Sequence, residues 1–145
     1  AQAEFQRLIE LGPTVPWGHG GVSMALTAQG RFDEAVNEAE KESTGWCRLF
    51  ALAIAQWGRN KTSASDLALA ELVKTSAELA ASQIAWAYAF RRDNDHAFEW
   101  LERAYQEHAS GLMWTKSLFL LESLHPDPRW PLLRKKIGLA DEQLK

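Results

Sequence analysis

Apolar residues recur every three to four positions along most of the chain, with charged and polar residues between them. The stretch "QIAWAYAFRRDNDHAFEWLERAY", residues 83–105, shows this most clearly, because two apolar-rich runs flank a short polar turn. Such spacing gathers the apolar side chains on one face of an α-helix. The alternating pattern of β-strands and the Asn-Gly or Asp-Gly turns of hairpins are almost absent. The pattern therefore predicts an all-α protein.

Turn signals divide the chain into short helices. Gly12 and Pro13 end the first helix, and "QGRF", residues 29–32, separates the next two. "RNKTSAS", residues 59–65, predicts a long turn that leads into a capping box from Ser63 to Asp66. The predicted helices span residues 3–11, 17–28, 32–42, 46–57, 63–74, 77–90, 95–107, 112–123 and 130–136.

Small and large apolar residues repeat in a similar order from one helix pair to the next. Each pair offers a small residue on its first helix and another near the start of its second, where the helices are expected to cross closely. Gly58 and Arg92 are expected at equivalent turns. The small residues are Ser23 and Ala35, then Ala51 and Ala68, then Ala85 and Ala97; the larger residues around them include Phe50, Ile84, Tyr88 and Leu101.

This order resembles the tetratricopeptide repeat (TPR), whose paired helices carry small residues at the crossing and aromatic residues around it. The resemblance implies an α-α superhelix, a solenoid of antiparallel helix pairs that forms a single domain over residues 1–145. Its parts would be a partial repeat at 1–13, repeats at 16–43, 45–76 and 78–107, and capping helices at 111–138.

In TPR proteins the first helices of the pairs line a concave groove that holds a peptide. The resemblance therefore implies a non-catalytic protein–protein interaction or scaffold module with an apolar-aromatic groove for a peptide or helix. The chain's own tail, rich in leucine after residue 111, is the alternative occupant of that groove. The groove residues implied are Trp17, Met24, Arg48, Leu52, Gln56, Ser82, Trp86 and Phe90.

Other interpretations stay open. The tail "SLHPDPRWPLLRKKIGL" is similar to the C-terminal TPR regions of bacterial multidomain regulatory proteins, and the abrupt amino terminus suggests a fragment. The chain would then be a regulatory or accessory domain of a larger enzyme or signalling protein. A small-molecule pocket near Trp86 is a further alternative. Phe5, Leu8 and Ile9 form a possible homodimer edge, since a terminal helix without its neighbour exposes its apolar face.

Composition narrows the function classes. The 145 residues carry a net charge of −3 and no basic stripe, which argues against a nucleic-acid partner. No apolar stretch is long enough to cross a membrane, and the single cysteine, Cys47, permits no intrachain disulfide, so we expect a cytoplasmic protein.

Candidate catalytic groups have simpler structural explanations. Cys47 lies in an apolar helix and is expected to be a buried, inert thiol. Asp93, Asp95 and His96 are expected to be turn and N-cap residues. The four histidines, His19, His96, His108 and His125, lack the spacing of a metal site. We therefore expect no enzyme activity, no cofactor and no metal.

Overall fold

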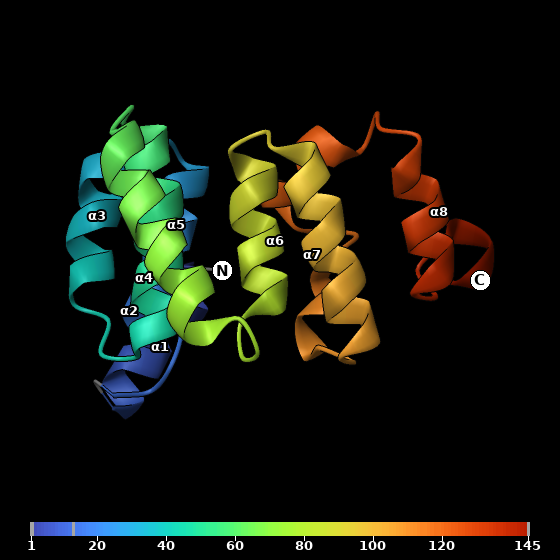
Figure 1. Ribbon diagram of the computed structural model, residues 1–145. Coiled ribbons are helices and arrows are strands. Elements are labelled where there is room, and N and C mark those ends of the chain that lie inside the picture. Colours follow the sequence, from blue (N-terminus) through green and yellow to red (C-terminus); the bar gives the residue numbers. More distant parts are fainter. Residues whose placement is uncertain (1, 13, 145) are drawn as a thin grey trace. The chain divides into compact units, whose positions relative to one another are not determined.

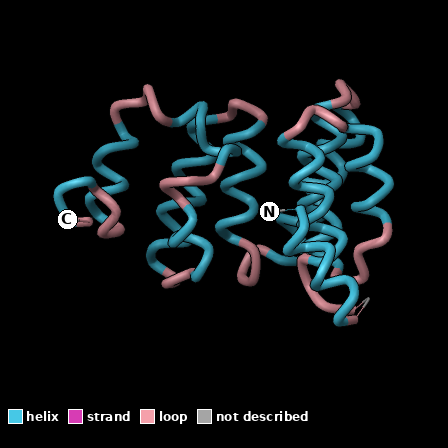
Figure 2. The backbone as a smooth tube through the Cα atoms, turned by 180° about the vertical axis from the view of Figure 1, so that it is seen from behind, coloured by secondary structure: helices cyan, strands magenta, loops and turns pink. Residues whose placement is uncertain are grey.

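The computed structural model describes residues 2–12 and 14–144, and every regular element in these residues is a helix (Figure 2). The all-α prediction is confirmed. The α-helices are α1 (Gln2–Leu11), α2 (Gly18–Ala28), α3 (Phe32–Glu40), α4 (Gly45–Gly58), α5 (Thr62–Ser76), α6 (Ala81–Phe90), α7 (Asn94–Gln106) and α8 (Arg129–Lys136). Two 3₁₀ helices, η1 (Ser110–Trp114) and η2 (Phe119–Leu124), lie between α7 and α8, and η3 (Asp141–Gln143) follows α8. The predicted stop at Pro13 lies outside the described residues.

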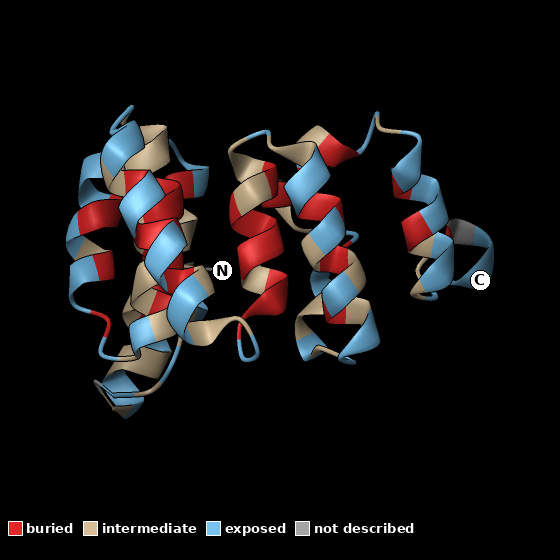
Figure 3. Cartoon of the chain, viewed as in Figure 1, coloured by how far each residue is buried: buried red, intermediate tan, exposed pale blue. Residues whose placement is uncertain are grey.

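The chain folds as two compact units, residues 1–77 and residues 78–145. In the first unit α2 pairs with α3 and α4 pairs with α5, while α1 packs on α2, and α4 contacts both α2 and α3 (Figure 1). In the second unit α6 pairs with α7, and η1 and η2 pack against α6. Figure 3 shows that most of α6 is buried, whereas α7 alternates buried and exposed residues along its length.

The same turn joins the two helices of all three pairs. Three residues connect the helices each time, at 29–31, 59–61 and 91–93. The middle residue has a positive φ: 75° at Gly30, 61° at Asn60 and 61° at Arg92. Its N–H and the next N–H donate to carbonyls three and five residues earlier, as in a Schellman motif.

The expected equivalence of Gly58 with Arg92 is therefore wrong, as is the long turn predicted at 59–65. Asn60 is the residue equivalent to Gly30 and Arg92, and α5 already begins at Thr62 without a side-chain cap from Ser63. Gly58 is the last residue of α4, where a Cβ would lie 2.3 Å from the Phe32 ring. Close packing of α3 against α4 thus explains this glycine.

Fully buried small residues meet where the paired helices cross. Ser23 Oγ of α2 donates a 2.7 Å hydrogen bond to the Ala35 carbonyl of α3. In the second pair Ser65 Oγ of α5 donates a 2.7 Å bond to the Ala53 carbonyl of α4. Ser23 and Ala53 lie the same number of residues before the positive-φ residue of their turns. Ala35 and Ser65 lie the same number of residues after it. The crossing expected at Ala68 is thus made by Ser65.

The third pair has alanines at both crossing positions. Ala85 and Ala97 are fully buried there, as the sequence predicts. The single weak helix predicted for residues 112–123 is instead two short 3₁₀ helices, because the backbone extends at Leu118, with φ −79° and ψ 121°. Three leucines of η2 belong to the core of the second unit: Leu120, Leu121 and Leu124.

Candidate functional site

In the first unit the predicted groove residues pack against the chain itself. The Trp17 ring meets Trp46 and Phe50 edge-on, with centroids 5.4 and 5.8 Å apart. Leu52 packs against the core cluster that contains Val22. The other predicted groove residues of this unit, Met24, Arg48 and Gln56, are half-buried. The Arg48 Nη1 group donates a 3.2 Å hydrogen bond to the Glu42 backbone carbonyl.

In the second unit the tail covers the predicted groove face of α6. Ser82 and Trp86 are 1% and 3% exposed. Gly111 of η1 lies against both, since a Cβ there would come within 2.6 Å of the Ser82 side chain and 3.3 Å of the Trp86 ring. One turn further on, the Phe90 and Phe119 rings make an edge-on contact at 6.3 Å.

Hydrogen bonds fasten the same tail at the end of α6. Ser123 Oγ donates to the Ala89 carbonyl at 2.7 Å, and Asn94 Nδ2 donates to the Ser123 carbonyl at 3.3 Å. The space considered for a small molecule near Trp86 is thus filled by η1. Of the two occupants left open for this face, the chain's own tail is the one that the structure places there.

The predicted dimer edge is partly used within the chain. Phe5 covers Gly21, where a Cβ would lie 2.1 Å from its ring, and Ile9 lies against Gly18. Leu8 is half-buried, while Leu11 is 79% exposed. The large apolar side chain of α1 that stays exposed is therefore Leu11, in the last turn.

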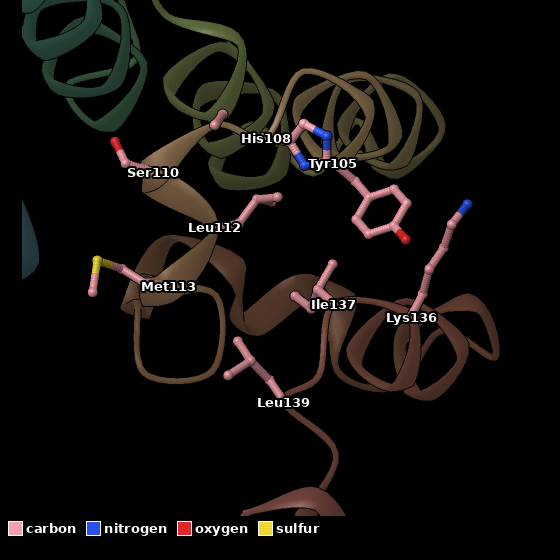
Figure 4. Close-up of a pocket in the computed structure, with 9 residues that line it drawn as sticks. Tyr105, His108, Ser110, Leu112, Met113, Lys136, Ile137 and Leu139 are labelled. Carbon is pink, nitrogen blue, oxygen red and sulfur yellow. The ribbon is translucent and has the colours of Figure 1, made fainter.

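An apolar pocket lies in the second unit, where the ends of α7 and α8 meet η1 (Figure 4). Its volume is about 480 Å³. Leu112, Ile137 and Leu139 point into it, whereas Met113 points away from it on the other side of η1. The remaining lining residues are Tyr105, His108, Ala109, Ser110 and Lys136.

Two similar clamps hold α8 beside α7 and so set the width of this pocket. Arg129 pairs with Asp95 at 2.9 Å, and its Cζ lies 4.4 Å from the centre of the Phe98 ring. Two turns later, Lys136 pairs with Glu102, and its Nζ lies 4.8 Å from the centre of the Tyr105 ring. In each clamp the carboxylate precedes the aromatic residue by three positions, so one helix face carries both.

The backbone turns at the ends of α7 and α8 are also alike. His108 (φ 54°) and Gly138 (φ 80°) follow the two helices. Their N–H groups donate to Tyr105 and Lys135 carbonyls, and the next N–H groups donate to carbonyls five residues earlier. These bonds satisfy backbone carbonyls at the ends of both helices.

A buried carboxylate in the first unit was not foreseen from the sequence. Glu42 is 2% exposed. Its Oε2 accepts a 2.8 Å bond from the Gly20 N–H in the first turn of α2, and its Oε1 accepts a 3.1 Å bond from the Thr44 N–H. Because the free N–H groups of a helix start attract negative charge, Glu42 acts as a structural cap at the start of α2.

Cys47, Asp93 and His96, the groups considered for chemistry in the sequence, also have structural roles. Burial raises the pKa of the Cys47 thiol to about 12, which fits the inert thiol expected there. Asp93 is the N-cap of α7, as predicted, and accepts from the His96 N–H at 3.4 Å and from the His96 ring at 2.8 Å. Among the described residues no group of three or more His, Cys, Asp or Glu side chains forms a metal site.

Within the described residues, no helix combines the length and the apolar character needed to span a membrane. Comparisons of the chain with protein families, with curated proteins and with solved structures find no match.

Proposed function

We propose that this chain is a non-catalytic protein–protein interaction module, and that a partner inserts an apolar side chain into the pocket between α7, η1 and α8. The single observation that carries this proposal is the pocket itself, with a volume of about 480 Å³ and walls of Leu112, Ile137 and Leu139. Binding pockets are commonly of this size, with apolar walls and a few polar groups at the edge.

The surface beside the pocket supports a partner larger than a small molecule. Met113 and Trp114 of η1 are 68% and 56% exposed. Large apolar side chains that remain in water beside a pocket are typical of interaction surfaces, where they form the contact around a central anchor. A peptide or helix long enough to pass over η1 would reach them while its anchor residue enters the pocket.

The proposal includes a TPR-like scaffold. Its support is the recurrence of one turn, with Gly30, Asn60 and Arg92 at the positive-φ position, and of one close crossing in each helix pair. The groove implied by the TPR resemblance is not the proposed docking site, because the tail fills it along α6 and the first unit packs its own predicted groove residues. The proposed docking site is instead the pocket between α7, η1 and α8.

A displayed-peptide selection tests the proposed function. Random peptides are selected on the wild-type chain, on Ile137→Asp, which places a charge in the pocket, and on Leu132→Asp. Leu132 is 71% exposed on α8 and does not line the pocket, so it is the matched control. We expect peptides with a shared apolar anchor to enrich on the wild type and on Leu132→Asp, and not on Ile137→Asp.

Enrichment of the same peptides on a folded Ile137→Asp variant would contradict docking in the pocket. If no peptide enriches on the wild type, the result would contradict peptide binding by this module. Circular dichroism of the three proteins gives the check that each is folded.

A further inference from the structure

We propose that the partner segment is acidic: its apolar anchor is flanked by carboxylate side chains that meet the basic edge of the pocket. This inference rests on the proposed function and adds the chemistry of the partner. The observation behind it is that the pocket lining, within the part of the chain that the structure describes, contains Lys136 and His108 and no carboxylate.

Lys136 is held in place at that edge. Its Nζ lies over the Tyr105 ring and pairs with Glu102 of α7. An ammonium group has three N–H donors, so the contact with Glu102 leaves others for a second carboxylate. The side chain is 43% exposed, and Figure 4 shows it at the side of the pocket next to Tyr105.

Nearby charges reinforce this preference. Arg134 and Lys135 precede Lys136 in the last turn of α8. On α7, Glu107 is paired with Arg103 at 2.8 Å, and Glu102 is paired with Lys136. Each of these two ion pairs is neutral as a whole, so Arg134 and Lys135 leave a positive balance at this end of α8.

The ends of two helices meet here, and the partial negative charge of helix carboxyl ends would oppose an acidic partner. The turns at His108 and Gly138 weaken that opposition, because their N–H groups take up terminal carbonyls. The basic residues of the last turn of α8 weaken it further. The balance at the pocket edge thus favours a carboxylate over an ammonium group.

Three labelled heptapeptides test the inference by fluorescence anisotropy on the full chain. The first has a central phenylalanine flanked by glutamates, the second replaces the glutamates by glutamines, and the third keeps the glutamates but replaces the phenylalanine by alanine. Each is titrated with the wild type, Lys136→Met, Lys136→Arg and Lys74→Met. Lys74 lies in α5 of the other unit and controls for net charge.

We expect the glutamate–phenylalanine peptide to bind the wild type about threefold more tightly than its glutamine counterpart, the effect of one exposed ion pair. The difference should persist in Lys136→Arg and Lys74→Met, and disappear in Lys136→Met and at about 1 M salt, where charges are screened. If Lys136→Met does not fold, the peptide comparison on the wild type and its salt dependence decide the result.

Equal binding of the two phenylalanine peptides to the wild type would overturn the acidic partner and leave the apolar anchor intact. Persistence of the difference in a folded Lys136→Met would equally overturn it. Loss of binding by both phenylalanine peptides, or equally tight binding of the alanine peptide, would instead overturn the proposed function on which the inference rests.

Discussion

Ser65 and Ala53 are joined by a 2.7 Å hydrogen bond from the Ser65 hydroxyl to the Ala53 carbonyl, deep between α5 and α4. The bond mirrors the one between Ser23 and Ala35 in the preceding helix pair, with donor and acceptor helices exchanged. A close crossing therefore recurs with either helix supplying the hydroxyl. The Ser65–Ala53 bond fixes how α4 and α5 are aligned along each other.

Enlarging Ser65 should destabilise the protein more than enlarging Ala68. Ser65→Leu adds bulk at a fully buried crossing and removes the bond to Ala53, so we expect a loss of about 2–3 kcal/mol. Ala68→Leu lies at the edge of the core, at 8% exposure, and should cost less. Urea unfolding measures both, with the exposed Ser63→Leu as control. A larger loss for Ala68→Leu would contradict the register.

Gly21 should tolerate no side chain while Phe5 is in place. In Gly21→Ala the new Cβ would lie 2.1 Å from the Phe5 ring, so the ring or the whole of α1 must shift, at a cost of about 1–3 kcal/mol. Phe5→Leu should recover part of this loss in the double variant, which a double-mutant cycle by thermal unfolding measures. Gly45→Ala is the control, since a Cβ there meets nothing within 4 Å. Additive losses from Gly21→Ala and Phe5→Leu would contradict the contact.

Removing the carboxylate of Glu42 should destabilise the first unit. Glu42→Ala leaves the Gly20 and Thr44 N–H groups without their acceptor, and we expect a loss of about 2–3 kcal/mol. Glu42→Gln retains an acceptor and should lose less. Glu40→Ala, exposed at the end of α3, should change the unfolding free energy by no more than about 0.5 kcal/mol. A Glu42→Ala variant as stable as Glu40→Ala would show that the cap contributes little.

The stability of the start of α8 should fall in acid, because the Asp127 carboxylate becomes protonated. Hydrogen bonds from the Arg129 side chain, with a further bond from its backbone N–H, lower the pKa of the Asp127 carboxyl to about 2. An aspartate in an unfolded chain has a pKa of about 3.9. The stabilisation is therefore fully present above about pH 4 and is lost as the pH falls through about 2.

Asp127→Asn measures this effect. The difference in unfolding free energy between the wild type and Asp127→Asn should be largest above about pH 4 and shrink towards pH 2. In an Arg129→Met background, which lacks the partner side chain, the pH dependence should largely vanish. A difference that grows as the pH falls would have the wrong sign for a depressed carboxyl pKa.

Local sequence signals predicted the helices well, because helix periodicity and turn residues act over a few positions. The crossings at Ala35 and Ala97 followed from small residues near a recognisable turn. The second pair was misplaced because Gly58 was interpreted as a turn residue, whereas its small size serves the Phe32 contact. Asn60 carried the correct signal, since asparagine is enriched at positive φ.

The candidate site depends on contacts that periodicity does not encode. The pocket joins residues 105–113 with residues 136–139, and its width follows from the pairing of Lys136 with Glu102 and Tyr105. The charge pattern of α7, with an acid three positions before Phe98 and another three positions before Tyr105, could have suggested a matching basic helix. Glu42 gave no such signal, because an acidic residue just after a helix usually lies in water.

Methyl NMR of the full chain with a peptide from the displayed selection tests the central claim most directly, because it separates the pocket from the groove implied by the TPR resemblance. We predict that titration shifts the methyl signals of Leu112, Ile137 and Leu139 and leaves those of Met24 and Leu52 unchanged. Shifts at Met24 and Leu52, with the signals of Ile137 and Leu139 unchanged, would contradict docking between α7, η1 and α8.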